Sequence, residues 1–449
     1  MTPFVVRSVS SLKGQINLSG DKSISHRAII LSSLSSGLTR INNFPSNKDC
    51  LETLGAFAKL GIKFKKEKKD TLLIIGKGLF GLRKPKGPIF VGESGTTLRL
   101  LLGVLAGQDF EVKLIAGSSL SKRPMRRVTE PLRSMGAKIR SRIKEQRSKM
   151  EEFAPIVVRG GALKPIAYRM PVASAQVKSA ILLAGLYANG KTVVTEPVPT
   201  RDHTERMLKS FKAGLKASGN KIVIKGNKGL VSPKDIYVPG DISSAAFFVV
   251  LAAISRNSEI CLRNISLNPG RGGIITVLKR MNADIRVTSS SLDSARGRQV
   301  AGGEPMGDVI VKSSRLKGVT INKKEVPSLI DELPILMVAA SLARGRSIFK
   351  GVQELRVKET DRIKSMTENL LKMGADIKVI ETGHLEEHIV IKGVECLGGA
   401  KVKSFGDHRT AMSMAIAGLA AEGATYIDDV SCIKKSFPEF LRILKRLTR

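Results

Sequence analysis

Six stretches of the chain are apolar on most faces of a helix, and each follows a turn of Gly, Ser or Asp residues. They are residues 20–37, 92–107, 173–190, 240–254, 327–345 and 405–423. An apolar pattern that continues around the helical turn is typical of a helix buried on all sides. We therefore expect six buried helices, and their recurrence along the chain predicts a repeated structural unit.

A second pattern follows most of these stretches. It combines the end of an amphipathic helix, a Gly or Asn stop and the start of a strand, at residues 54–64, 131–139, 277–285 and 369–377, with a looser copy at 211–217. Short β-rich runs fill the gaps, among them TLLIIG, KIVIKG and HIVIKG. The sequence thus predicts an α/β fold of six units, each with one buried and one outer helix beside a small sheet.

Length divides these units between domains. A chain of 449 residues exceeds the size of one hydrophobic core, so we expect two domains of three units each. The segment VPGDIS (238–243) lies near the middle and fits a crossing between them. The longest apolar run, residues 245–254, is too short to span a bilayer.

The composition limits which binding partners and which cellular compartment we expect for the protein. The formal net charge of +36 suggests an anionic partner, although much of it can be ordinary surface Lys and Arg. The four cysteines lie far apart without a CxxC pair, and the first residues contain no apolar segment of signal-peptide length. We therefore expect reduced thiols in a cytoplasmic protein.

The first apolar stretch begins with an unusual number of polar side chains. Asp21 or Ser23 can cap a helix that starts here, and Ser23 and Arg27 share a face because they are four residues apart. Lys22 stands at the same helix start, where backbone N–H groups already favour an anion. The segment predicts either a phosphate or carboxylate site or a capped helix with solvated charges.

Similar groups stand near the other helix starts and in further polar segments. They are Gly95, Thr96, Arg123, Ser174, Gln176, Arg201, Asp331, Glu332, Lys358, Glu359, Arg362, His408, Arg409, Lys434 and Lys435. If the buried helices aim their N-termini at one cleft, these cations would converge on substrates that carry phosphate and carboxylate groups. The few carboxylates among these cations would then be proton carriers. Asp331 and Glu332 stand at the head of an apolar helix, where a carboxylate is either a cap or an acid/base group. Glu359 precedes Arg362 by three residues, so we expect both on one helical face.

Two other patterns carry little weight. IIGKGLFG (74–81) contains GxGxxG, but the proline-containing LRKPKGP (82–88) follows where a dinucleotide site needs a helix, so we interpret these glycines as turn residues. HLEEH (384–388) spaces two histidines as a metal pair on a helix would, but β-rich segments flank it. We predict an exposed hairpin there.

Three motifs are highly specific together: GDKSISHRA (20–28), RVKETDRI (356–363) and DHRTAM (407–412). With them the chain resembles the 5-enolpyruvylshikimate-3-phosphate synthase family over essentially its whole length. The resemblance implies two similar domains, each of three βαβαββ units with buried helices, as an inside-out α/β barrel with the active-site cleft between the domains. The implied domains are 1–20 with 240–449, and 21–239.

The resemblance also implies the reaction. Shikimate 3-phosphate and phosphoenolpyruvate are joined through a tetrahedral intermediate, inorganic phosphate is released, and neither a metal nor an organic cofactor takes part. The implied partners are these small molecules alone, with no specific nucleic acid and no membrane, and we expect a monomer.

The resemblance assigns roles residue by residue. Shikimate 3-phosphate would be bound by Lys22, Ser23, Arg27, Ser174, Gln176, Arg201, Asp331 and Lys358. Phosphoenolpyruvate would be bound by Lys22, Gly95, Arg123, Gln176, Arg362, Arg409 and Lys435. Asp331 would accept the hydroxyl proton, Glu359 would handle the C3 proton, and Lys22 would assist at the departing phosphate. Sequence alone does not decide which carboxylate moves which proton.

The chain departs from the family pattern at a few positions. Glu93 and Glu354 stand where many members carry Asn, and Ala175 replaces a common Ser. The contacts of these three residues therefore stay open. Arg201 follows the branch of the family that uses Arg instead of a Ser/Tyr pair.

Two alternatives are weaker. The sister enzymes that use UDP-N-acetylglucosamine carry a loop Cys and an Asn after the first Lys, whereas Ser23 follows Lys22 here and the loop Cys is missing. A nucleic-acid-binding or RNA-end-processing protein would fit the charge, but it would need stacking aromatics, and only 4% of the residues are aromatic.

Overall fold

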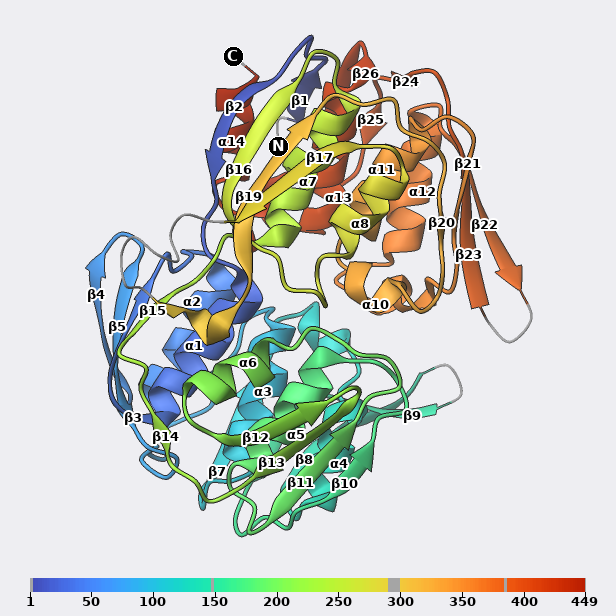
Figure 1. The fold of residues 1–449 in the computed structure, drawn as a ribbon. Coiled ribbons are helices and arrows are strands. Elements are labelled where there is room, and N and C mark those ends of the chain that lie inside the picture. Colours follow the sequence, from blue (N-terminus) through green and yellow to red (C-terminus); the bar gives the residue numbers. More distant parts are fainter. Residues whose placement is uncertain (1–2, 147–148, 290–298, 383–385, 449) are drawn as a thin grey trace. The chain divides into compact units, whose positions relative to one another are not determined.

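The computed structural model describes residues 3–146, 149–289, 299–382 and 386–448, and it is a mixed α/β protein (Figure 1). The chain divides into two compact units. The first unit comprises Met1–Leu18, Gly240–Ser291 and Met306–Arg449, and the second comprises Ser19–Pro239 and Leu292–Pro305. Each unit is built from sheets around buried helices, which is the predicted inside-out α/β fold.

The central helices of the second unit are α1 (Lys22–Leu34), α3 (Gly95–Leu105) and α5 (Ala175–Gly185). A polar side chain caps each of them: Asp21, Ser94 and Ser174 accept hydrogen bonds from backbone N–H groups of the first turn. Such a cap contributes about 1 kcal/mol. Nearly all their other side chains are buried, and α3 packs against both α1 and α5. The buried helices predicted at these positions are confirmed.

The sheets of the second unit repeat one pairing pattern, in which two parallel strands are followed by an antiparallel hairpin. Their strand orders are β18-β15-β3-β5-β4 with β14 beside β3, β6-β7-β9-β8, and β10-β11-β13-β12. The bounds are β3 (Ser35–Asn42), β4 (Lys63–Lys68), β5 (Thr71–Lys77), β6 (Ile89–Phe90), β7 (Glu111–Ile115), β8 (Lys138–Gln146), β9 (Lys149–Arg159), β10 (Ala167–Arg169), β11 (Lys191–Thr195), β12 (Gly214–Ser218), β13 (Lys221–Lys225), β14 (Leu230–Val231), β15 (Asp235–Tyr237) and β18 (Gln299–Val300).

Amphipathic helices pack outside this core at the predicted positions. They are α2 (Lys48–Lys59), α4 (Arg126–Ser134) and α6 (His203–Ser210), with the short 3-10 turns η1 (Leu120–Lys122) and η2 (Ala301–Gly303) nearby in the same unit. Each ends in a tight turn that leads into a strand. In the looser copy, Lys212 takes the left-handed conformation (φ 60°) that glycine adopts in the copies at Gly61 and Gly136.

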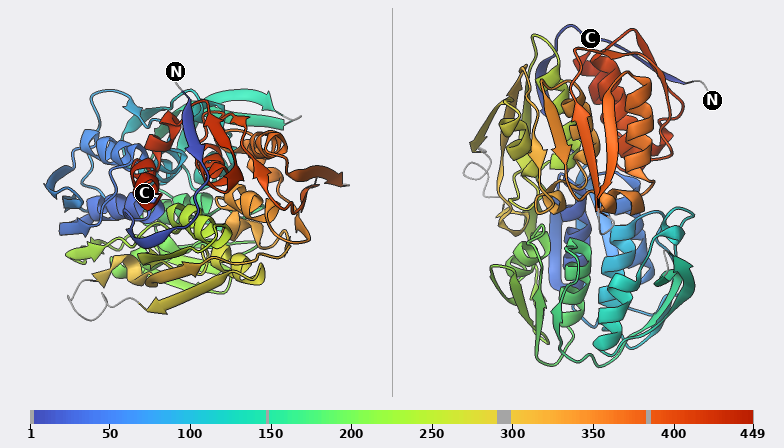
Figure 2. Two further views of the ribbon diagram at one scale, coloured as in Figure 1. Left: turned by 90° about the horizontal axis from the view of Figure 1, so that it is seen from above. Right: turned by 90° about the vertical axis from the view of Figure 1, so that its right-hand side faces the viewer.

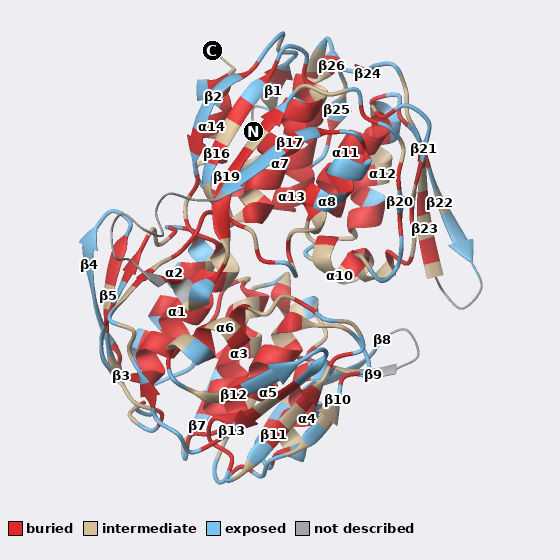
Figure 3. Cartoon of the chain, in the orientation of Figure 1, coloured by how far each residue is buried: buried red, intermediate tan, exposed pale blue. Residues whose placement is uncertain are grey.

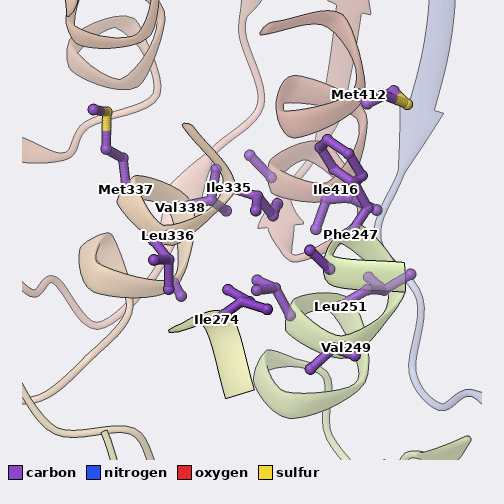
Figure 4. Packing of buried hydrophobic residues seen from close by; sticks show 14 of the residues in the cluster. Phe247, Val249, Leu251, Ile274, Ile335, Leu336, Met337, Val338, Met412 and Ile416 are labelled. Atoms are coloured by element: carbon purple, nitrogen blue, oxygen red, sulfur yellow. The ribbon is translucent and has the colours of Figure 1, made fainter. Parts of the chain in front are cut away.

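The first unit repeats this architecture. Its central helices are α7 (Ile242–Ile254), α11 (Leu333–Ser341) and α13 (His408–Leu419), which pack on one another. Figure 4 shows Phe247, Ile335 and Ile416 among the apolar side chains that these helices contribute to one core. Burying each such side chain contributes about 1.5–3 kcal/mol. Figure 3 shows the same contrast in both units, with buried central helices and exposed outer strands.

Two sheets of the first unit follow the same pairing rule, and in the third β1 from the start of the chain takes the antiparallel place beside β27. Their orders are β17-β19-β16-β2, β20-β21-β23-β22 and β1-β27-β25, with the short pair β24-β26. The strands are β1 (Phe4–Arg7), β2 (Lys13–Asn17), β16 (Glu259–Ser266), β17 (Asp284–Ser289), β19 (Met306–Lys312), β20 (Thr320–Ile321), β21 (Arg346–Phe349), β22 (Asp376–Thr382), β23 (Glu386–Lys392), β24 (Leu397–Gly398), β25 (Lys401–Val402), β26 (Ala421–Glu422) and β27 (Ala424–Ile427). The remaining helices are α8 (Gly273–Arg280), α10 (Val326–Leu329), α12 (Arg362–Lys372), α14 (Phe440–Leu447), η3 (Gln353–Val357) and η5 (Ser431–Lys435). Figure 2 gives two further views of these elements.

Two of the passages from one unit to the other lie at related glycines, Gly20 and Gly240. Their N–H groups donate to the carbonyls of Asn43 and Asn264, which both have a positive φ near 55°. A Cβ at Gly20 would lie 2.1 Å from the Asn43 carbonyl oxygen, so only glycine fits there. Strand β2, which precedes α1, pairs in the first unit with β16, whereas β15, which precedes α7, pairs in the second unit with β3.

A further segment belongs to the second unit although its neighbours in sequence do not. Strand β18 pairs with β15, and Glu304 contacts His203 at the start of α6. The predicted domain boundaries put this segment with residues 240–449, because nothing in its short polar pattern marks the excursion.

The structure agrees with the interpretation of IIGKGLFG (74–81) as a turn and of HLEEH (384–388) as part of a hairpin, as far as it describes these residues. The glycines that follow β5 form a turn without a helix, and Gly78 has φ 77°. Strands β22 and β23 pair as an antiparallel hairpin, while His384 lies outside the described residues.

Candidate active site

The start of α1 carries the first candidate residues. Asp21 is the cap and accepts from the Ile24 N–H at 2.9 Å, which settles the choice between Asp21 and Ser23. Lys22 pairs with Asp49 of α2, with 3.1 Å between Nζ and Oδ2. The helix start is therefore both capped and cationic.

Arg27 lies one turn further along α1 and is buried. Its Nε donates to the Thr204 hydroxyl at 2.6 Å, one terminal nitrogen to the Ser179 hydroxyl at 2.8 Å, and the other to the Ser23 carbonyl at 2.8 Å. Arg201 donates to the Ser23 hydroxyl at 3.2 Å. Burial and the nearby Arg201 lower the pKa of Arg27 to about 10, so Arg27 still carries its charge at neutral pH. Arg27 and Arg201 thus both donate to Ser23, and two cations beside a hydroxyl group suit the binding of an anion.

A buried ion cluster underlies this place. Lys178 of α5 is 1% exposed, and its Nζ lies 2.8 Å from Glu196 and 2.6 Å from Glu205. Burial raises the pKa of Glu205. Lys178 also donates to the Thr200 carbonyl at 3.4 Å. Because it ties α5 to the segment before α6, this cluster fixes the backbone that carries Arg201.

The start of α3 holds a second group of cations. A Cβ built at Gly95 would lie 2.9 Å from an Arg99 nitrogen and 3.2 Å from an Arg123 nitrogen, so both guanidinium groups approach this glycine. Arg99 donates to Gln176 at 2.5 Å, and Gln176 donates to the Thr96 hydroxyl at 2.8 Å. The structure therefore brings together the starts of α3 and α5 with Arg123.

The first unit holds an arginine cluster around Asp331. Arg271 lies 2.8 Å from Asp331 Oδ2, while Arg362 and Arg409 each have a nitrogen 3.8 Å from Oδ1. Arg409 also donates to the Asp331 carbonyl at 2.6 Å. These arginines come from the turn before α8 and from the starts of α12 and α13. A carboxylate surrounded by cations in this way can serve as a proton acceptor beside a bound anion.

Arg362 is held on several sides. Its Nε lies 2.9 Å from Asp407 and another nitrogen lies 2.6 Å from Glu359. Burial alone would lower the pKa of Arg362, but Asp407, Glu359 and Asp331 raise it above its usual value. Its charge is therefore permanent.

The pairing of Glu359 with Arg362 has a different cause from the predicted one. Helix α12 begins at Arg362 with Asp361 as its cap, so Glu359 precedes the helix and does not lie on it. The Glu359 side chain belongs to the bend of residues 358–360 between η3 and α12, and from there it reaches Arg362.

The predicted helix of residues 327–345 is also interrupted. It breaks into α10 and α11, with Asp331 in the intervening turn. Glu332 occupies the N-cap position of α11, but its side chain makes no capping hydrogen bond there, so the capping interpretation is wrong for Glu332. Pro334 near the start of α11 explains the break, because it has no N–H to donate to the Ile330 carbonyl and its ring would clash with that carbonyl in a continuous helix.

Two other predicted residues, Lys358 and Lys435, also belong to the first unit. Lys358 pairs with Glu354, with 3.4 Å between the charged atoms. Lys435 is exposed at the end of η5, which packs against α13.

Comparisons with known proteins identify the family. The profile of the family described as EPSP synthase (3-phosphoshikimate 1-carboxyvinyltransferase) matches residues 6–444. The 3-phosphoshikimate 1-carboxyvinyltransferase of Desulforamulus reducens is 45% identical over 443 residues, 99% of each chain. That of Geobacillus kaustophilus is 46% identical over 441 residues, 98% of each chain.

Solved structures agree. An EPSP synthase structure from Acinetobacter baumannii is 41% identical, has a TM-score of 0.84 and covers 99% of this chain, which in turn covers 97% of that one. The chain belongs to the EPSP synthase family.

The structure gives two of the departures from the EPSP synthase pattern a local role. Glu93 accepts hydrogen bonds from the backbone N–H groups of Leu120 at 2.7 Å and Ser119 at 3.3 Å, so it caps the η1 turn that leads to Arg123. Glu354 pairs with Lys358.

Sequence reasoning missed several residues that complete these EPSP synthase clusters. They are Asp49, Arg99, Lys178, Arg271 and Asp407. A charged residue inside an otherwise apolar helix could have identified Arg99 and Lys178, because such a residue must be paired when buried. Arg271 follows a Pro-Gly turn, which gave no comparable signal.

Among the described residues, no group of His, Cys, Asp and Glu side chains is placed to hold a metal ion. In the same part of the chain, no helix has the length and apolar character needed to cross a membrane.

Proposed function

We propose that the cationic groups of both units act in one reaction. As a member of the EPSP synthase family, the protein transfers the enolpyruvyl group of phosphoenolpyruvate to the 5-hydroxyl of shikimate 3-phosphate and releases inorganic phosphate. The observation that carries the proposal is the gathering of arginines around Asp331, in a protein whose two substrates are both anions.

We assign shikimate 3-phosphate mainly to the second unit. Arg27 and Arg201 meet at Ser23, and Ser174 and Gln176 stand at the start of α5. Charge-assisted hydrogen bonds from such groups are the strongest that a phosphate can receive. Asp331 and Lys358 would complete the set from the first unit.

We assign phosphoenolpyruvate to residues of both units. Arg123 reaches Gly95 at the start of α3, where the missing side chain leaves the backbone N–H groups accessible. Lys22 and Gln176 join them from the same unit. Arg362, Arg409 and Lys435 would supply the other cations. Together they would neutralise the charge that develops as phosphate departs.

The chemistry follows from the carboxylates in this setting. Asp331 would take the proton of the 5-hydroxyl as its oxygen adds to C2 of phosphoenolpyruvate. Glu359, 2.6 Å from Arg362, would deliver a proton to C3 and remove one from it when phosphate leaves the tetrahedral intermediate. Lys22 would stabilise the departing phosphate.

A binding experiment separates these assignments. Titration calorimetry with shikimate 3-phosphate should show Arg201→Ala weakening binding at least about 10-fold, the value of one charge-assisted hydrogen bond. Lys435→Ala should leave that binding within about threefold but raise the KM for phosphoenolpyruvate, as expected for the loss of a charged contact. Arg280→Gln, which removes an exposed pair with Glu325, is the control. Equal effects of both site variants on shikimate 3-phosphate would contradict the assignment.

We also infer that the enzyme works as a monomer in the cytoplasm. Each unit encloses its own apolar core, and its small-molecule substrates require no macromolecular partner. The separated, unpaired cysteines fit a reducing compartment. Sedimentation at several concentrations tests the oligomeric state.

A further inference from the structure

Arg271 is a buried arginine that the proposed mechanism does not yet use. It lies in the turn before α8, where its N–H donates to the Asn268 carbonyl at 2.8 Å and the Gly270 N–H donates to the Asn268 side chain at 2.9 Å. Its side chain is 4% exposed. The turn therefore holds this guanidinium in a fixed direction.

The guanidinium of Arg271 bridges two neighbouring carboxylates. One terminal nitrogen lies 2.8 Å from Asp331 Oδ2, and the other lies 3.2 Å from Glu332 Oε1. The second nitrogen also donates to the Ser243 hydroxyl, which in turn donates to Glu332. Because Glu332 is completely buried and anchored on α7, it fixes the far side of the guanidinium. Glu332 and Ser243 thus hold one side of the Arg271 guanidinium, and its other side points at Asp331.

The other oxygen of Asp331 has different surroundings. Arg362 and Arg409 are 3.8 Å from Oδ1, which is beyond hydrogen-bond distance. Both are proposed to bind phosphoenolpyruvate, whose negative charges would then engage them. Arg271 already bonds protein carboxylates, so its charge would stay directed at Asp331 after the substrate has bound.

We propose that Arg271 is a positioning residue, which fixes the orientation of the Asp331 carboxylate and keeps that carboxylate charged so that it can accept the 5-hydroxyl proton. This inference rests on the proposed role of Asp331. Arginine suits this task because its planar guanidinium has two terminal nitrogens: one bonds Asp331 while the other is held by Glu332 and Ser243. A lysine has a single charged nitrogen and cannot divide these contacts in the same fixed geometry.

The charges that face Asp331 determine how the loss of Arg271 would change the pH dependence of kcat/KM. They are Arg271 before α8, Arg362 on α12 and Arg409 on α13, with Glu332 next in sequence and Glu359 beyond Arg362. Removing the closest cation makes the charged carboxylate harder to maintain. The acid limb of the kcat/KM profile should therefore move to higher pH in Arg271→Gln.

The test compares Arg271→Gln and Arg271→Lys with the wild-type enzyme over pH 5 to 9. In Arg271→Gln we expect kcat to fall at least about 10-fold, the KM of each substrate to stay within about threefold, and the acid limb to move up by about one pH unit. Arg271→Lys keeps the charge but loses the second nitrogen that Glu332 and Ser243 hold, so its acid limb should return towards the wild-type position while kcat stays reduced. Arg280→Gln, on the adjacent α8, is the matched control.

The outcomes separate this inference from the proposed function. If Asp331→Asn retains near-normal activity, the role of Asp331 itself is wrong. If Asp331→Asn is inactive but folded Arg271→Gln has an unmoved acid limb, or raises KM with kcat unchanged, Arg271 does not position Asp331. If Arg271→Gln does not fold, Arg271→Lys decides alone: a reduced kcat at unchanged KM supports the inference, and a wild-type kcat overturns it.

Discussion

Arg27 shows how one residue can serve both the fold and the site. Its guanidinium receives support from the hydroxyls of Thr204 and Ser179 and from the Ser23 carbonyl, which positions its charge beside Arg201. Arginine suits this place because its several donors can hold protein groups and a substrate anion together. The Lys22 side chain, in contrast, is 21% exposed, and it pairs with Asp49.

Replacing these two residues should therefore have different structural costs. We expect Lys22→Ala and Arg27→Ala each to lower kcat/KM at least about 100-fold, because each removes a cation from a substrate anion. Arg27→Ala should also lower the free energy of unfolding by about 1–3 kcal/mol, since two buried hydroxyls lose a partner. Steady-state kinetics with urea unfolding measures both effects. Arg40→Ala, which removes an exposed pair with Glu67, is the control, and a site variant with near-normal kcat/KM would contradict the assignment.

His26 links the same helix to pH. It is fully buried, contacts the Thr53 hydroxyl at 2.7 Å, and burial lowers its pKa to about 3. The folded protein keeps His26 neutral at a pH where the unfolded chain, with a pKa near 6.5, binds a proton. Its contribution to stability is complete above pH 6.5 and is lost as the pH falls from there towards 3.

His26 should make the free energy of unfolding differ between pH 8 and pH 5. Between pH 8 and pH 5 this single group should reduce the free energy of unfolding by about 2 kcal/mol, and His26→Gln should remove that part of the pH dependence. Urea unfolding of both proteins at the two pH values is the measurement. An unchanged pH dependence in His26→Gln would show that His26 is protonated in the folded state.

At the scale of elements, the starts of the central helices hold many of the residues proposed to bind substrate. Asp407 illustrates this because its two oxygens have separate tasks: Oδ1 accepts from the N–H groups of Arg409 and Thr410, while Oδ2 lies 2.9 Å from Arg362. One carboxylate therefore caps α13 and fixes a cation on α12.

Asp407→Asn should separate these tasks. An amide can still cap the helix through its oxygen, but it then turns its NH₂ group towards Arg362. We expect the free energy of unfolding to fall by about 1–3 kcal/mol, as a buried charged group loses its partner, and the KM for phosphoenolpyruvate to rise at least about 10-fold. Thermal unfolding and kinetics measure the pair. A stability loss with an unchanged KM would mean that Asp407 acts as a cap alone.

How far the sequence predicts these elements depends on the strength of the local pattern. The apolar helices and the turns after the outer helices were predictable, because periodicity and Gly or Asn stops are local signals. The break between α10 and α11 and the position of Glu359 before α12 were not, because each depends on a turn that packing selects. Arg271 reaches Asp331 over 60 residues of sequence, and no local pattern indicates that pairing.

At the scale of the whole molecule, the net charge of +36 is the dominant property. Self-repulsion of this charge destabilises the compact state, while its field attracts anionic substrates. Salt screens both effects, with a Debye length that falls from about 10 Å at 0.1 M to about 3 Å at 1 M.

Salt should therefore change stability and catalysis in opposite directions. Raising the KCl concentration from about 0.05 M to about 0.5 M should raise the melting temperature. It should also lower kcat/KM several-fold, with a smaller change in kcat. Thermal unfolding and initial rates in the same buffers test this. A kcat/KM that does not depend on salt would show that the charge does not contribute to substrate capture.

The central claim is that cations from both units act in one enolpyruvyl transfer, with Asp331 as the proton acceptor. The most direct test is the release of inorganic phosphate by the purified enzyme with shikimate 3-phosphate and phosphoenolpyruvate, with each substrate omitted in turn and with Asp331→Asn beside the wild type. The account predicts release that requires both substrates and is lost in folded Asp331→Asn. Release that needs only one substrate, or that persists in Asp331→Asn, would contradict it.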